Sequence, residues 1–178
     1  HVAVLRQLGH DACELRVPSE LDGVDGVVLP GGESTTQLLL LAESGLGTAL
    51  DTRIRAGLPV LATCAGLILA AREVQAPPQP SFAWLDVVVA RNAWGRQVHS
   101  FEATADPDAA FGALPLVFIR APRILATGPE VQVLARFQGE PVLVRQGRFY
   151  AATFHPELSG ESRVHAAVFG RGLKVSRE

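Results

Sequence analysis

The chain has 178 residues, of which 48% are hydrophobic and 19% charged, a composition typical of a folded protein with a sizeable core rather than a disordered one. The net charge of -2, with no basic stripe, argues against a nucleic-acid-binding protein. No apolar run approaches the roughly 18 residues that span a bilayer, and no secretory signal is visible, so we expect a cytoplasmic protein.

Cysteine and methionine usage adds two expectations. Cys13 and Cys64 are too few for a disulfide scaffold and suit a reducing cytosol, so we expect two free thiols, with a single bridge as the alternative. The sequence opens on His1 and contains no methionine. We therefore expect the natural protein to start upstream of His1.

The first half of the chain alternates helical and strand-like patterns. Val2, Leu5 and Leu8 are spaced like one helix face, and residues 12–17 alternate like a strand. Residues 26–30 form a short, wholly apolar strand of the kind that is buried on both faces of a parallel sheet. The other elements expected here are a turn or short helix at 18–23, helices at 35–42 and 48–57, a strand at 58–63 and a helix at 65–74.

The second half changes in character after a Pro-rich loop at 75–82. Short strands follow at close intervals, which predicts antiparallel pairs or hairpins, and a helix at 160–170 closes the chain. The expected strands are 85–92, 97–104, 115–122, 131–137, 141–146 and 148–154. Together the two halves predict one domain, 1–178, with an α/β fold. It is an open, mostly parallel, flavodoxin-like sheet with helices on both faces and added antiparallel strands.

Three groups of chemically useful residues follow predicted strands directly. The sequence GGES follows the strand at 26–30, Cys64 follows the strand at 58–63, and HPE follows the strand at 148–154. Because ligands of open α/β sheets bind outside the carboxyl ends of the strands, this placement predicts a site.

Cys64 is a candidate nucleophile. Small neighbours, Ala62, Ala65 and Gly66, permit a tight strand-to-helix turn with a strained backbone. A thiol at a helix N-terminus is favoured as thiolate, and the Ala65 amide is free to bind an oxyanion. The alternative is a buried structural cysteine, which the cysteine alone would favour.

His155 and Glu157 are candidate partners of that nucleophile. In an extended segment residues two apart point to the same side, so Glu157 would orient His155 as a general base. The alternatives are a surface histidine and an acid near the start of the last helix. Together with Cys64 they form the nucleophile, base and orienting acid of acyl transfer.

The segment PGGES offers the second half of such a site. Gly31 and Gly32 permit backbone geometry that is closed to other residues, and an exposed Gly32 amide would complete a two-donor oxyanion hole. The alternative is a glycine turn into a helix capped by Ser34, and both interpretations can hold together.

Five motifs in this order, LPGGESTT, TCAGLI, RNAWGRQVHSFEA, VFIRAP and FHPEL, carry a family resemblance. From His1 to about Phe169 the chain resembles the glutaminase subunits of pyridoxal 5'-phosphate synthase, a branch of the class I, triad-type glutamine amidotransferases. Ile68 stands four residues after the cysteine, where relatives in other pathways usually have glutamine.

The resemblance implies that L-glutamine is hydrolysed to glutamate and ammonia through a thioester on Cys64, with His155 as base and Glu157 orienting it. The amides of Gly32 and Ala65 would hold the oxyanion. The residues implied to bind glutamine are Gly32, Glu33, Ser34, Arg91, Ile119 and Arg120. Arginine suits the substrate carboxylate.

The resemblance also implies a partner, a synthase subunit with a (β/α)8 barrel that receives the ammonia and builds the coenzyme. The coenzyme is a product there, so we expect no cofactor and no metal in this chain. Arg96, Gln97, His99 and Glu102 are expected to face the partner or be structural, and His10 and His165 lack a motif context.

Two departures from the family pattern stand out. Ala62 replaces the usual glycine two residues before the nucleophile, which predicts a tighter elbow. The family's first strand and its QG loop would lie before His1, and we expect them upstream. Two other functions remain open, a cysteine hydrolase or peptidase of a related α/β class and a non-catalytic regulatory subunit.

Overall fold

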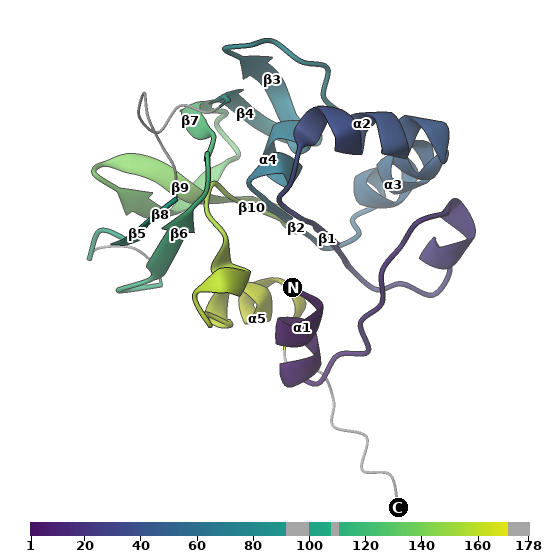
Figure 1. The fold of residues 1–178 in the computed structure, drawn as a ribbon, viewed down its shortest axis with the longest axis horizontal. Coiled ribbons are helices and arrows are strands. Elements are labelled where there is room, and N and C mark those ends of the chain that lie inside the picture. Colours follow the sequence, from purple (N-terminus) through teal and green to yellow (C-terminus); the bar gives the residue numbers. More distant parts are fainter. Residues whose placement is uncertain (92–99, 108–110, 171–178) are drawn as a thin grey trace, which may run out of the picture.

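The computed structural model describes residues 1–91, 100–107 and 111–170. Their strands form a five-stranded sheet in the order β1-β2-β10-β9-β8, a three-stranded sheet β3-β4-β7 and a two-stranded sheet β5-β6 (Figure 1). The strands are β1 (Val27–Leu29), β2 (Val60–Thr63), β3 (Ala71–Gln75), β4 (Leu85–Ala90), β5 (Phe101–Thr104), β6 (Pro115–Phe118), β7 (Arg123–Thr127), β8 (Gln132–Phe137), β9 (Glu140–Gln146) and β10 (Phe149–Ala152). The helices are α1 (Val2–Gln7), α2 (Ser34–Glu43), α3 (Leu46–Arg55), α4 (Ala65–Ala70) and α5 (Arg163–Phe169), with 3-10 turns η1 (Pro18–Leu21) and η2 (Pro156–Leu158).

The centre of the large sheet is parallel. Strand β2 pairs in parallel with β1 on one side and with β10 on the other, whereas β9 and β8 continue the sheet in antiparallel fashion. The α/β fold with antiparallel strands from the second half of the chain is therefore confirmed. Because β1, β2 and β10 run in the same direction, their carboxyl ends meet at one edge.

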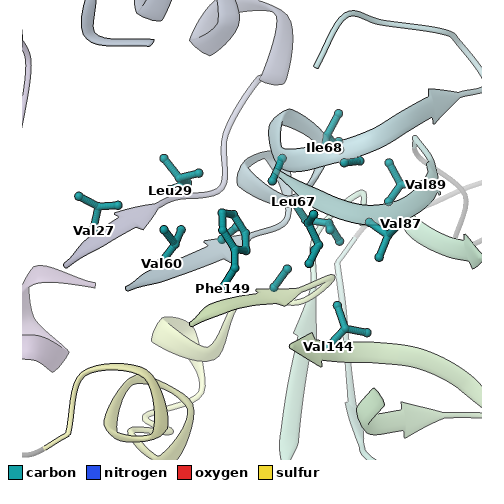
Figure 2. Packing of buried hydrophobic residues seen from close by; sticks show 14 of the residues in the cluster. Val27, Leu29, Val60, Leu67, Ile68, Val87, Val89, Val144 and Phe149 are labelled. Carbon is teal, nitrogen blue, oxygen red and sulfur yellow. The ribbon is translucent and has the colours of Figure 1, made fainter. Parts of the chain in front are cut away.

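Strand β2 shows how the sheet separates two apolar clusters. Its side chains alternate, so Val60 and Ala62 belong to one cluster and Leu61 to the other, all at 0% exposure. Figure 2 shows the first cluster, in which Leu67 and Ile68 of α4 pack over the sheet. Burying one such side chain contributes about 1.5–3 kcal/mol, which holds α4 against the sheet.

The second cluster lies on the opposite face. Val164 of α5 packs there with Leu61, Phe118 and Phe154, all fully buried. Figure 1 shows α5 and α1 together on this side, with α2, α3 and α4 on the other, so helices cover both faces as predicted. None of the helices in the described ranges has the length and apolar character that crossing a membrane requires.

The strand predicted at 12–17 is wrong, since this segment forms neither helix nor strand. Its apolar side chains are partly used, because Ala12 is buried and Leu15 packs against the first cluster. The backbone amides of Arg16 and Val17 donate hydrogen bonds to the Glu20 carboxylate, at 2.6 and 3.1 Å, instead of to a neighbouring strand.

The helix predicted at 65–74 is also too long. Helix α4 ends at Ala70, and the next five residues form β3, which pairs in parallel with the valine-rich β4. Tertiary pairing with β4 overrides the helix propensity of this alanine-containing stretch. Strand β7, which pairs antiparallel with β4, was not expected from the sequence.

Candidate active site

Cys64 occupies the turn between β2 and α4. Its φ of 49° and ψ of −102° are sparsely populated for a non-glycine residue, a strained backbone held by the structure around it. The Cys64 amide donates to the carbonyl of Ala152 at 2.9 Å, and its carbonyl accepts from the Ile68 amide at 3.2 Å. These two bonds tie the elbow to β10 and to α4.

Gly66 is required for the elbow by close packing. A Cβ at this position would lie 2.1 Å from the carbonyl oxygen of Leu29 in β1, so no other residue fits without moving backbone. The absence of a side chain lets α4 start directly against β1. Ala62, the departure from the family pattern, is fully buried in the first cluster, where its methyl group is accommodated.

His155 follows β10 and is held from two sides. Its amide donates to the carbonyl of Val117 in β6 at 2.8 Å. Its ring lies against Gly31, where a Cβ would be 2.3 Å from the His155 Cε1 atom. The reason for glycine at position 31 is therefore room for the imidazole, since Gly31 is not among the residues with positive φ and Gly32 is, at +145°.

Glu157 approaches His155 by a different route from the one predicted. The segment after His155 is the 3-10 turn η2 rather than an extended strand, and Glu157 lies within it. The turn brings the Glu157 Oε1 atom to 2.9 Å from the His155 Nδ1 atom. A carboxylate at this distance fixes the proton on Nδ1 and leaves Nε2 for chemistry.

The electrostatics favour a protonated ring at His155. Burial lowers its pKa, but hydrogen bonds with Cys64 and Glu157, together with their charges, outweigh burial and raise the pKa to about 9. These contacts therefore stabilise the imidazolium that forms when the ring takes the proton of the Cys64 thiol. This is the charge arrangement of a nucleophile and its general base.

The Cys64 thiol has one further contact. Its Sγ atom lies 3.8 Å from the carbonyl oxygen of Ile119, the residue after β6, and Cys64 is 6% exposed. Strand β6 and the residue after it thus contact the site twice, through the Val117 carbonyl at His155 and the Ile119 carbonyl at Cys64.

The predicted glutamine-binding residues lie around the start of α2. Glu33 is the N-cap of this helix and accepts from the amides of Thr35 and Thr36 at 3.1 and 3.2 Å. The cap is therefore Glu33 and not Ser34. The second Glu33 oxygen lies 3.3 Å from Nη2 of Arg91, and hydrogen bonds led by the Thr35 hydroxyl lower the pKa of this carboxyl.

Ser34 is almost completely buried, and its hydroxyl donates to Oε1 of Gln79 at 2.9 Å. The side-chain amide nitrogen of Gln37 donates to the carbonyls of Pro30 and Gly31 at 3.2 and 3.1 Å and so supports the glycine turn. The sequence interpretation missed both glutamines. No motif marks them, and only the fold brings them to this turn.

Other predicted residues lie apart from this cluster. Arg120 is exposed with a φ of 45°, and no described contact joins its side chain to the triad. Glu102 is exposed on β5, and His10 bonds the Gly170 carbonyl at 3.0 Å. Arg96, Gln97 and His99 fall outside the described residues.

Both cysteines are free, with Cys13 exposed and Cys64 buried. Within the described ranges, no group of three His, Cys, Asp or Glu residues could hold a metal ion. A cavity of about 1320 Å³ lies beside the site, between α1, the segment 10–16, β1 and α5. His1 and Pro30 line it, but Cys64, His155 and Glu157 do not.

Comparison with known proteins agrees with this geometry. The chain is 48% identical over 167 residues to "Pyridoxal 5'-phosphate synthase subunit PdxT" of Thermotoga neapolitana, which covers 93% of this chain and 88% of the relative. The protein of the same name from Mycobacteroides abscessus is 50% identical over 167 residues, which are 93% of this chain and 86% of that relative.

Solved structures show the same similarity. A crystal structure of a glutamine amidotransferase has 42% identity and a TM-score of 0.88, covering 94% of this chain and 89% of its own. A putative GMP synthase component from Thermoplasma acidophilum shares the fold, with 20% identity and a TM-score of 0.63 over 93% of this chain and 83% of its own. The sequence model of the SNO glutamine amidotransferase family matches residues 1–172. The chain belongs to the SNO glutamine amidotransferase family.

Proposed function

We propose that this chain hydrolyses L-glutamine to L-glutamate and ammonia through a Cys64 thioester and passes the ammonia to a synthase subunit that makes pyridoxal 5'-phosphate. The observation that carries the proposal is the row formed by Cys64, His155 and Glu157 at the carboxyl ends of β2 and β10. Membership of a glutamine amidotransferase family and the names of the close relatives support the choice of reaction.

The chemistry follows from the contacts. The proton of the Cys64 thiol moves to His155, and the sulfur attacks the side-chain amide carbon of glutamine. His155 then gives the proton to the departing nitrogen, and the C–N bond breaks to release ammonia. His155 next takes a proton from water, which attacks the thioester, and the thiol leaves with that proton as glutamate is released. Glu157 keeps the ring in one orientation throughout.

The negative charge that develops on the amide oxygen of the substrate must be stabilised by hydrogen-bond donors near Cys64. We assign this role to the backbone amides of Gly32 and Ala65. Ala65 is the first residue of α4, where amides have no partner within the helix. The positive φ of Gly32 gives that peptide an orientation that is unfavourable for residues with a Cβ.

The free amino-acid end of glutamine has a carboxylate and an ammonium group. Arg91 suits the carboxylate and Glu33 the ammonium, and they already form an ion pair in the structure. Gly32, Ser34, Ile119 and Arg120 complete the proposed binding set. Arg120 would have to turn toward the substrate, since its side chain is exposed.

The proposed partner is a (β/α)8-barrel synthase subunit, and the proposed location is the cytoplasm. The relatives are named as subunits of pyridoxal 5'-phosphate synthase, which supports a heteromeric enzyme. The coenzyme is the product of that enzyme, so this chain is proposed to work without a cofactor.

Replacement of each cysteine tests the function. Cys64→Ala should lower glutamate formation by about 1000-fold or more in the presence of the synthase subunit, because the nucleophile is gone. Cys13→Ala is the matched control, an exposed free cysteine away from the triad, and should keep full activity. Full glutamine hydrolysis by Cys64→Ala would refute the proposal. Peptide hydrolysis without glutamine turnover would indicate a cysteine hydrolase instead.

A further inference from the structure

His1 lies directly behind the triad, at the start of α1. Its ring is 11% exposed and contacts three residues from different parts of the fold. The Nδ1 atom lies 2.9 Å from Nε2 of His165 in α5. The Nε2 atom lies 3.2 Å from the Thr63 hydroxyl, next to the nucleophile, and 3.3 Å from Oε2 of Glu157.

The second oxygen of Glu157 makes this contact important. Oε1 is used by His155, whereas Oε2 is buried and has no hydrogen-bond partner within the described part of the chain. The contact that the structure provides for it is Nε2 of His1. A buried carboxylate oxygen without a compensating polar group is destabilising, so the orientation of Glu157 depends on this neighbour.

The identity of the neighbours determines where the His1 protons lie. Burial lowers the pKa of His165, which favours a neutral ring that takes part at Nε2 either as donor or as acceptor. A carboxylate only accepts, so His1 interacts favourably with Glu157 when its Nε2 atom carries a proton. Where His165 donates to Nδ1, a neutral His1 carries its proton on Nε2, 3.3 Å from Oε2. Where Nδ1 donates to His165, His1 carries a proton on Nε2 only as an imidazolium.

We propose that His1 is a positioning residue of the catalytic site, which holds the Glu157 carboxylate so that its other oxygen orients His155. The inference rests on the proposed glutaminase function and extends the row of interacting side chains from Cys64, His155 and Glu157 to His1. His165 supports His1 from behind, and it is completely buried. His1 does not touch the reacting atoms.

Two conservative variants separate this role from a merely structural one. In His1→Gln the side-chain amide nitrogen occupies the place of Nε2 and can still donate to Glu157. In His1→Asn the amide reaches only the place of Nδ1 and loses Glu157. In the full chain assayed with the synthase subunit, kcat for glutamine should fall about tenfold in His1→Asn and stay within about threefold in His1→Gln. KM should change little in both, since the glutamine-binding residues are untouched.

His10→Asn is the matched control. This histidine is close by in the sequence but bonds the Gly170 carbonyl at the surface, so its replacement should leave kcat unchanged. Equal kcat values in His1→Asn and His1→Gln, whether both normal or both reduced, would overturn the inference. Loss through KM alone would do the same.

A double-mutant cycle with Glu157→Ala tests directly whether His1 acts through Glu157. If His1 acts through Glu157, adding His1→Asn to Glu157→Ala should cause no further loss of kcat. A further tenfold loss in that background would mean that His1 acts by another route and would overturn the inference. The proposed function is tested separately by Cys64→Ala. If Cys64→Ala is inactive and His1→Asn is unaffected, only the role of His1 is rejected.

Discussion

The two halves of the proposed site are built differently. The triad is attached to strands, since Cys64 comes directly after β2 and His155 lies three residues after the end of β10, and both are buried below 10% exposure. The residues proposed to bind glutamine lie in loops and at the start of α2. Glu33 has a half-exposed side chain and Arg120 is exposed. Arg91 is the last residue that the structure describes before residue 100.

This difference indicates a division of labour. Strand pairing fixes the triad through backbone bonds such as the one from the Cys64 amide to Ala152. The substrate side is held by side-chain contacts such as the Arg91–Glu33 ion pair, which is worth little at an exposed site. Changes to the triad should therefore act on kcat, and changes to the loops should act on KM.

Among changes that leave the proposed catalytic side chains in place, the largest effect is expected for Gly31→Ala. The new methyl group would collide with the His155 ring, whose Cε1 atom would be 2.3 Å away, and displace the base. A displacement of about 1 Å lowers kcat by about 100-fold, which steady-state kinetics with the synthase subunit would measure. Gly23→Ala is the control, because a Cβ there meets open space, and its positive φ makes the change a stability effect only. Normal kcat in Gly31→Ala would contradict the rigid placement of His155.

A smaller effect is expected for Arg91→Leu, which removes the proposed carboxylate ligand. KM for glutamine should rise about tenfold while kcat changes less, because a charge-assisted bond to the ground state is lost. Arg72→Leu removes an arginine that pairs with Asp86 away from the site and should leave both constants unchanged. A fall in kcat without a change in KM for Arg91→Leu would contradict the proposed separation of the triad, which acts on kcat, from the loops, which act on KM.

The smallest effect is a change in a pKa. Cys64 raises the pKa of His155, so in Cys64→Ala the value should fall below about 9, with Glu157 still supporting it. NMR titration of the histidine ring protons measures this directly, with Cys13→Ala as the control. An unchanged pKa would mean that Cys64 and His155 do not interact in solution.

The same pKa predicts a pH effect on stability. The folded-state value lies above the ordinary 6.5, so the stabilisation from a protonated His155 is complete below pH 6.5 and is lost as pH rises through about 9. Urea unfolding of the wild type across this range should show the decline. The decline should be smaller in Cys64→Ala, and an equal slope in both proteins would count against the interaction.

Much of the fold could be predicted from local patterns. The apolar runs at β1 and β2, the first helix and the short strands of the second half appear in the structure, although the buried residue of that helix is Val4 and not Val2 or Leu5. The predictions were wrong for the segments 12–17 and 71–75, whose local patterns are compatible with more than one backbone structure. The Glu20 carboxylate bonds the amides of Arg16 and Val17, and β4 pairs with the residues after Ala70. Neither partner is visible from the segment itself.

For the proposed site, the sequence by itself determined the candidate residues, because the cysteine elbow, the glycine pair and the HPE segment are contiguous motifs that follow strands. Only the tertiary structure decided how they cooperate. Three contacts show this: Gly31 lies against the His155 ring, a 3-10 turn brings Glu157 to Nδ1 of His155, and His1 lies beside Oε2 of Glu157. The first and third join residues far apart in the sequence, and the second needs a turn where an extended segment was expected. The physical reason is that these contacts depend on the packing of β1, β10, α1 and α5 around one edge of the sheet, which no local pattern encodes.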